Sequence, residues 1–352
     1  MRVAILADIH GNLPAVEAVL EDIARTAPDY IVAAGDLALR GAHPKEVVQL
    51  LDDKCDSLLM GNTDCYIAGN YLGGAYRERD HWKTDLLHWT RDQLGPDLVK
   101  RLGELPFSVR LSPRRGQDLF VCHANPRNLE ESVDPTLDER QLARFFQHLD
   151  AAAVAFGHLH FPYRRRLGRM IIADVASAGI PRDGDLRPAW GLFTYTPKGW
   201  RVQIRRVRYH VKKATQAIQS RKVPGAPLLI HKMIEARYRH HAALQEAARR
   251  HSGLPPLHPH HPHVPPANRS GVLPPPPGSE PQQISHAELG LTPPTAAEIA
   301  ADREDSMPNA TISGMPDIMA DSGEHPAIRE DELAAEPDPG TSGPIILSEV
   351  EG

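Results

Sequence analysis

The chain has 352 residues, a formal net charge of −5 and 41% hydrophobic residues, and its composition divides unevenly along its length. Residues 253–352 hold 19 of the 33 prolines, no aromatic residue, and 16 acidic against three basic side chains, a net charge of −13. Such a segment buries too little apolar surface to offset the entropy lost on ordering, so we predict a disordered, Pro-rich, acidic tail. About 250 residues are left to fold, which is enough for a large core.

Other classes of protein are excluded by composition. Three cysteines give no framework of disulfides, and no run approaches the roughly 18 apolar residues that a membrane span needs. Asp8 interrupts the short apolar run at the N-terminus, which therefore does not resemble a signal peptide. We expect a cytoplasmic protein with free thiols and no membrane partner.

The first part of the chain is basic, because a total of −5 and a tail of −13 leave +8 for residues 1–252. Much of this charge lies in 198–250, which has 14 Lys and Arg against two Glu. This stretch could follow a nucleic-acid backbone, but a solvated strand edge and helix face is the favoured interpretation. We predict a domain at 1–210, a basic helical extension at 211–252 and the tail at 253–352.

Apolar runs and helical periodicity alternate along the first domain. Residues 2–7 are apolar with little alternation, as in a strand buried on both faces, and Val16, Val19 and Ile23 share one face of the helix that follows. Asn12 is expected to cap that helix. Further strands are predicted at 30–36, 57–62, 107–111, 118–123, 153–158, 170–175, 190–196 and 199–209, and further helices at 44–53 and 138–149.

The alternation predicts a largely parallel first sheet, and the strands from 153 onward are expected to complete a second sheet. A capping box of Thr136 and Glu139 is predicted for the helix at 138–149. Residues 65–105 differ from their surroundings, being rich in Gly, Tyr and Trp, and are expected to form an irregular excursion with one helix.

Five polar patches each follow an apolar run, at the strand ends where open α/β sheets build their sites. They read LADIHGN, AAGDLA, LMGNTD, VCHANP and AFGHLH, and they supply the candidate ligands Asp8, His10, Asp36, Asn62, His123, His158 and His160. Seven ligands exceed the needs of one ordinary ion but suit two ions that share a carboxylate. Mixed nitrogen and oxygen ligands without thiolate favour Mn, Fe, Ni or Zn over Ca or Mg.

In this order the patches resemble the calcineurin-like metallophosphoesterase superfamily, whose pattern is D-x-H, G-D, G-N, a lone His and G-H-x-H. The phrases ADIHGNLPAVEAVL and ASAGIPRDGD resemble its small bacterial and archaeal branch. The resemblance covers about residues 1–210 and implies an α/β fold with two mixed β-sheets packed face to face between flanking helices, a four-layer α/β/β/α sandwich.

The resemblance also implies roles for the ligands. Asp8, His10 and His160 would bind one divalent ion, Asn62, His123 and His158 would bind a second, and Asp36 would bridge them. The implied activity is hydrolysis of phosphodiester bonds by a metal-bridging hydroxide, with phosphomonoesters and nucleotide anhydrides as further substrate classes. Catalytic roles would fall to Asp36, Asn62, Asp64 and His123.

One position departs from the family pattern. Many members have His after the G-N pair, where it is thought to protonate the leaving group, but this chain has Thr63 followed by Asp64. An exposed Asp64 could orient water or a ligand, yet would be a poor acid because it is ionised at neutral pH. We therefore expect a preference for leaving groups that need little protonation.

The substrate is expected to be a small phosphorylated molecule. Arg40, Asn125 and Arg127 lie within a few residues of candidate ligands and are candidates for contacts with its phosphate. A different class of function remains open, in which a catalytically weak metal-binding scaffold or regulatory protein uses the basic segment and the Pro-rich tail. The intact set of seven ligands favours the enzyme, and the sequence leaves the oligomeric state open.

Overall fold

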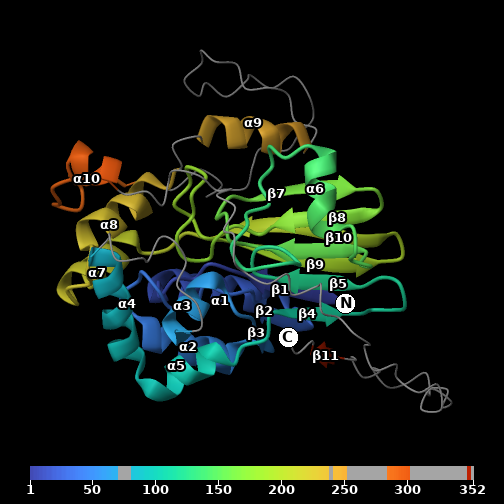
Figure 1. Cartoon of the computed structure of the whole chain (residues 1–352), viewed down its shortest axis with the longest axis horizontal. Helices are drawn as coiled ribbons and strands as arrows, with labels where there is room; N and C mark the ends of the chain where they lie inside the picture. Colours follow the sequence, from blue (N-terminus) through green and yellow to red (C-terminus); the bar gives the residue numbers. More distant parts are fainter. Residues whose placement is uncertain (70–80, 238–240, 252–283, 302–346, 350–352) are drawn as a thin grey trace.

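Two β-sheets pack face to face with helices on both outer faces, as the computed structural model shows (Figure 1). The structure describes residues 1–69, 81–237, 241–251, 284–301 and 347–349. The predicted four-layer α/β/β/α arrangement is confirmed, and it rests on three layers of buried side chains between the four layers of backbone.

The first sheet has the strand order β10-β9-β1-β2-β3. Its parallel strands are β1 (Arg2–Leu6), β2 (Tyr30–Ala33) and β3 (Ser57–Leu58), connected by α1 (Leu13–Thr26) and α2 (Pro44–Lys54). Strand β9 (Ala189–Thr196) runs antiparallel to β1, and β10 (Gly199–Arg206) runs antiparallel to β9.

Placing β9 and β10 in the second sheet was therefore wrong. Strand β9 pairs with β1 so that Leu192 lies opposite Ala4 and Phe193 opposite Val3. Leu192 joins the core under the helices, whereas Phe193 joins the core between the sheets. A strand buried on both faces fits a central position in either sheet, so its composition could not decide which sheet it joins.

The second sheet has the order β11-β4-β5-β6-β8-β7. It comprises β4 (Ser108–Leu111), β5 (Leu119–Cys122), β6 (Ala153–Phe156), β7 (Tyr163–Leu167), β8 (Met170–Asp174) and β11 (Leu347–Glu349). Strands β5, β6 and β8 are parallel. Strand β7 was not predicted because its three consecutive arginines hide the alternation of an edge strand, in which one side chain is buried and the next exposed.

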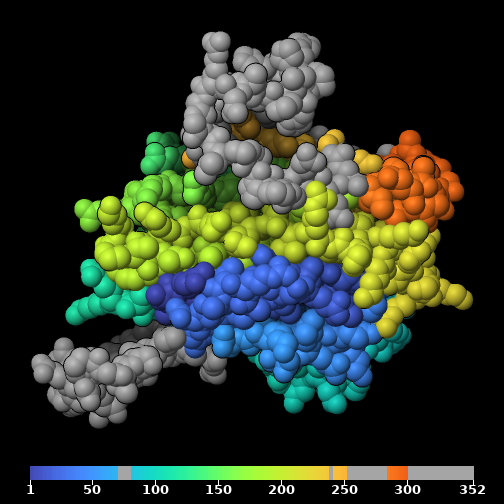
Figure 2. All heavy atoms as spheres, turned by 180° about the vertical axis from the view of Figure 1, so that it is seen from behind, coloured from blue at the N-terminus to red at the C-terminus, as the bar shows by residue number. Residues whose placement is uncertain are grey.

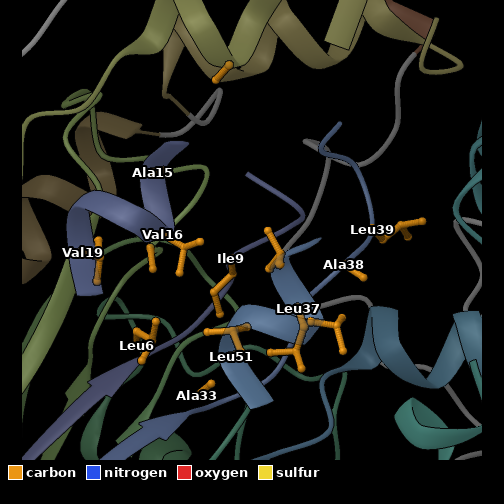
Figure 3. Close-up of a cluster of buried hydrophobic side chains, with 14 of the residues drawn as sticks. Leu6, Ile9, Ala15, Val16, Val19, Ala33, Leu37, Ala38, Leu39 and Leu51 are labelled. Atoms are coloured by element: carbon orange, nitrogen blue, oxygen red, sulfur yellow. The ribbon is translucent and has the colours of Figure 1, made fainter. Parts of the chain in front are cut away.

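Alternation along the strands divides the core into layers. On β1, Ala4 and Leu6 face the helices, whereas Val3 and Ile5 face the second sheet. Figure 3 shows part of the helix-side layer, where Leu6 of β1 lies near Val16 and Val19 of α1. A third layer joins the outer face of the second sheet to α6 (Glu139–Phe146).

Helices rather than irregular chain follow the Asn62 patch. They are α3 (Asn62–Ala68), α4 (His81–Leu94) and α5 (Pro96–Gly103), where one helix was expected, and residues 70–80 of the excursion lie outside the described residues.

Two expected helix caps are absent from the described structure. The side chain of Asn12 does not cap α1 and instead donates to the carbonyl of Gly179, 2.7 Å away. The capping box of α6 pairs Asp138 with Gln141, in place of the predicted Thr136 and Glu139.

The basic extension forms α7 (Val211–Ser220), α8 (Ala226–Glu235) and α9 (His241–His251). Ile218 and Met233 are buried in the helix-side core, so α7 and α8 pack on the first domain. No helix among the described residues is long and apolar enough to cross a membrane.

Within the predicted tail, the structure describes 284–301, which ends in α10 (Ala296–Ala301), and β11. The segment 284–301 (orange) lies beside α8 in both overall views (Figures 1 and 2). The other tail residues lie outside the described ranges, so disorder stays a prediction there.

Candidate metal centre

All seven candidate ligands lie at or just beyond the carboxyl ends of strands. Asp8 and His10 follow β1, Asp36 follows β2, and Asn62 begins α3 after β3. His123, His158 and His160 follow β5 and β6 of the second sheet. The packing of the two sheets brings these strand ends together. For example, Nε2 of His160 lies 3.2 Å from Oδ1 of Asp8. The structure thus brings the whole predicted set together.

Backbone strain is concentrated in this set. Asp8, His10, Asp36, His158 and His160 all have positive φ, between 50° and 69°. Each such residue costs on the order of 1–3 kcal/mol, and residues held this way cluster at functional sites. Asp8 and His10 therefore lie in a loop of left-handed residues just beyond the strand end, and this loop directs both side chains to the centre.

Glycines precede three ligands because a side chain there would collide with the centre. A Cβ on Gly157 would lie 2.3 Å from Oδ2 of Asp8, and a Cβ on Gly61 would lie 2.3 Å from Oδ1 of Asp36. The G-D, G-N and G-H pairs in the sequence thus have a steric cause, since the backbone before one ligand touches another ligand.

Backbone carbonyls fix the tautomers of the four imidazoles. The Nδ1 atoms of His10, His123 and His160 lie 2.5–3.0 Å from the carbonyl oxygens of Leu39, Ala34 and Ile180. A carbonyl only accepts, so these Nδ1 atoms donate, and the neutral rings keep their lone pairs on Nε2. In His158 the roles are reversed: Nε2 donates to the carbonyl of Glu130 at 2.9 Å, which leaves the lone pair on Nδ1.

With these tautomers, lone pairs face one another in two groups. In the first, Nε2 of His160 lies 3.1 Å from Nε2 of His10 and 3.2 Å from Oδ1 of Asp8. In the second, Nε2 of His123 lies 3.2 Å from Nδ1 of His158 and 3.0 Å from Oδ1 of Asn62. Acceptors at these distances repel unless a cation or a proton lies between them.

Asp36 connects the two groups. Its Oδ2 lies 3.5 Å from Nε2 of His10, and its Oδ1 lies 3.5 Å from Nε2 of His123. Oδ1 of Asp8 is buried and has no hydrogen-bond partner in the described structure, which is costly for a carboxylate in the interior. Asp8, His10 and His160, and likewise Asp8, Asp36 and His123, place ligand atoms within 4.8 Å of one another. This donor set fits divalent metal ions.

Burial and neighbouring charges prepare most of these groups for metal binding. Burial, reinforced by the charge of Arg40, lowers the pKa of His10 to about 3, and burial together with His123 lowers that of His158 to about 4. Burial opposes ionisation of Asp8, but His160 and the other imidazoles lower its pKa below the usual value. His123 differs: burial opposes its charged form, yet Asp36 raises its pKa, so a proton and a metal ion compete for its Nε2.

Asp64 lies differently from what its neighbours in sequence suggested. It is fully buried, not exposed, and its oxygens accept from the backbone N–H groups of Asp36, Leu37 and Gly61 at 2.8–3.0 Å. Burial, with the charge of Asp36, raises its pKa to about 7. Asp64 therefore ties the Asp36 loop to the start of α3 and has its oxygens engaged by backbone. This corrects the expectation of an exposed, fully ionised carboxylate, and a catalytic role for Asp64 stays a prediction.

The three candidate substrate contacts separate in the structure. Asn125 is buried, and its amide bonds to the backbone of Arg127, Asn128 and Glu131. This interaction holds the loop after His123, so the expected phosphate contact of Asn125 is wrong. Arg40 has φ 94°, and its charge acts on His10 and Asp36. Phosphate binding by Arg40 and Arg127 stays a prediction.

Further residues support the centre without having been predicted. Nδ2 of Asn62 donates to the Tyr66 hydroxyl at 3.1 Å, and that hydroxyl in turn donates to Glu130. The Ser177 hydroxyl donates to the carbonyl of Asp8 at 2.6 Å and accepts from the N–H of Ile180. Tyr66 stands one helical turn after Asn62, a spacing that could have indicated it, whereas nothing local in the sequence points to Glu130 or Ser177.

Comparisons with known proteins agree with this geometry. Residues 1–162 match the calcineurin-like phosphoesterase family. An uncharacterized protein of Methanocaldococcus jannaschii is 27% identical over 237 residues, which are 63% of this chain and 93% of that protein.

Two solved structures are also similar. The chain resembles a metallophosphoesterase from Sphaerobacter thermophilus with 26% identity and a TM-score of 0.56, covering 67% of this chain and 99% of that one. A hypothetical protein from Pyrococcus horikoshii, at 20% identity and a TM-score of 0.58, covers 67% of this chain and 98% of its own, and shows the shared fold.

Proposed function

We propose that the chain is a metal-dependent phosphoric ester hydrolase of the calcineurin-like phosphoesterase family, which its residues 1–162 match, and that it hydrolyses phosphodiesters with two divalent metal ions. The proposed substrate is a small phosphorylated molecule whose leaving group needs little protonation. The proposed compartment is the cytoplasm, and Mn, Fe, Ni or Zn are the proposed metals because the ligands are nitrogen and oxygen without thiolate.

The observation that carries this proposal is the pair of facing lone-pair groups joined by Asp36. A single ion would relieve only one of the two groups, and the other imidazole pair, about 3 Å apart, would need a proton between its lone pairs. Asp36 presents one oxygen to each group, as a bridging ligand must. Two metals roughly 3.5–4 Å apart are an established device for phosphoryl transfer.

The residues divide between two sites. Asp8, His10, His160 and Oδ2 of Asp36 would hold one ion. Asn62, His123, His158 and Oδ1 of Asp36 would hold the other. When bound, the ions supply a coordinated water of lowered pKa and neutralise charge on the phosphate oxygens.

The chain itself contributes orientation. The carbonyls of Leu39, Ala34, Ile180 and Glu130 fix each imidazole in the tautomer that a metal requires, which removes reorganisation from the reaction. Arg40 adds a positive charge near His10 and Asp36, where the negative charge of a phosphate would be stabilised.

The preference for a leaving group that needs little protonation follows from what stands beside Asn62. Thr63 is fully buried, and its hydroxyl has no hydrogen-bond partner in the described structure. A hydroxyl does not protonate a leaving group near neutral pH, so the general-acid contribution of roughly 10²–10⁴-fold is not supplied from this position. Esters with an activated leaving group, such as aryl phosphodiesters, lose the least hydrolysis rate when a general acid is missing.

The test compares bis-p-nitrophenyl phosphate with p-nitrophenyl phosphate as substrates. Protein stripped of metal is assayed alone and after addition of Mn²⁺ or Ni²⁺, beside Asp36→Asn and the exposed control Asp53→Asn. We expect metal-dependent turnover that favours the diester and is lost only in Asp36→Asn. Faster hydrolysis of the monoester would overturn the diester preference, and equal activity of Asp36→Asn would overturn the assignment of the site.

A further inference from the structure

A second cluster of metal-type ligands lies between α8 and the segment 284–301. His231 and Glu235 are four residues apart on α8 and therefore share one face of that helix. His286 comes from the chain segment beside it, and the three side chains place ligand atoms within 4.8 Å of one another. None of these residues belongs to the centre around Asp36.

The turn that carries His286 is built to hold its shape. The Ser285 N–H donates to Glu288 at 2.7 Å, and the Glu288 N–H donates back to the Ser285 hydroxyl at 3.2 Å, which is the pattern of a capping box. The Leu291 N–H then closes the turn on the carbonyl of His286 at 2.9 Å, just after Gly290 with φ 68°. A ligand on such a turn is already oriented before it binds.

Apolar contacts dock this turn on the folded domain. Ile284, Leu289 and Leu291 pack against the helix-side core, to which Leu229 and Met233 of α8 also belong. Both overall views place the segment beside α8 (Figures 1 and 2). The meeting of His286 with α8 therefore has a hydrophobic cause that is independent of any ion.

The two imidazoles in this cluster lie against each other, and one of them has an unpartnered nitrogen. The rings of His231 and His286 stack with centroids 5.3 Å apart and an interplanar angle of 29°. Nε2 of His286 is buried and has no hydrogen-bond partner in the described structure, a costly state for a polar atom. Glu235 is exposed at the edge, so its carboxylate can turn toward the rings and an ion can enter from solvent.

We propose that His231, Glu235 and His286 form a separate Zn²⁺ site that fastens the segment 284–301 to α8. Two imidazoles and one carboxylate are a ligand set that zinc accepts, with water as the fourth ligand. Zinc–ligand distances near 2.0–2.2 Å require ligand atoms about 3.4 Å apart, so the cluster contracts slightly around the ion. The ion stabilises a contact that the apolar residues have already formed.

Zinc counting in the full-length chain tests this site. Protein is equilibrated with Zn²⁺, desalted and analysed for metal, beside His286→Gln, His231→Gln and the exposed control His148→Gln. We expect both site variants to lose about one zinc ion per chain relative to wild type and to the control, because two remaining ligands hold zinc poorly. Equal zinc content in His286→Gln and wild type would overturn the proposal.

Hydrogen exchange supplies a second readout that does not depend on activity. Zinc should slow amide exchange in residues 284–291 of wild type and of His148→Gln, but not of His286→Gln. A zinc ion lost only on replacing His258, His260, His261 and His263, with exchange at 284–291 unaffected by zinc, would assign the binding to that His-rich run and overturn the proposal. Phosphodiester hydrolysis is measured alongside as a check that each variant is folded, and it should not change.

Discussion

Replacing Gly157 by alanine should disable the centre while leaving the protein folded. The new Cβ would lie 2.3 Å from Oδ2 of Asp8 and 2.5 Å from the Cβ of Ala7. An ordinary contact begins near 3.4 Å, so the Asp8 carboxylate must retreat by about 1 Å, because Ala7 is fully buried and has no room to yield. Overpacking of this kind costs about 1–3 kcal/mol of stability.

The larger effect should be on catalysis. A displacement of about 1 Å in a positioned group costs on the order of 100-fold in rate, so kcat/KM for bis-p-nitrophenyl phosphate should fall by about that factor. Metal affinity should fall as well, because Asp8 is a proposed ligand.

Activity and urea unfolding are to be measured on the same preparations. Gly116→Ala is a control for adding a methyl group without a collision, because nothing lies within 4 Å of its added Cβ. Gly116 has φ 72°, which Gly157 does not share, so this control also includes a backbone cost and should lower stability without lowering activity. Wild-type kcat/KM and metal affinity in Gly157→Ala would refute the steric argument for the glycine before His158.

Three further predictions concern the centre, the tail and a partly buried ion pair. Asp36→Ala should abolish turnover and lower the metal content, since it removes the proposed bridge; wild-type rates with metal bound would exclude a two-ion mechanism. Deletion of 253–352 should leave folding and hydrolysis intact, and loss of activity at an unchanged Tm would show that the tail shapes the active site. Burial opposes ionisation of Asp22, but hydrogen bonds from Arg205 lower its pKa below the usual value. The ionised carboxylate therefore stabilises the fold above about pH 4, and this contribution is lost as the pH falls further. Urea unfolding between pH 2 and 7 should therefore show a steeper acid loss in wild type than in Asp22→Asn, and parallel curves would contradict this.

Much of the site could be predicted because its ligands stand at strand ends, and strand ends are visible in a sequence. Asp36 follows the apolar run of β2 and His123 that of β5, so two local patterns located both. The four-layer fold was implied by the resemblance to a family, since apolar runs show that strands exist but not which sheet they join. Strand β9 illustrates this limit, because either sheet would bury both of its faces.

Side chains that support the ligands were harder to predict. Asp64 and Asn125 lie next to ligands in the sequence and have suitable chemistry, but both turn inward to satisfy backbone N–H groups. Their roles depend on the tertiary position of loops such as the one after β2. Glu130 meets Tyr66 across 64 residues of sequence, and no local pattern records such a contact.

The central claim is that Asp36 bridges two metal ions between the lone-pair groups. Anomalous scattering from crystals soaked in Mn²⁺ tests it most directly. Two peaks roughly 3.5–4 Å apart, one on the side of His10 and His160 and the other on the side of His123 and His158, are the expected result. A single peak, or peaks that do not share Asp36, from protein that hydrolyses the diester at its full rate would contradict the two-ion centre.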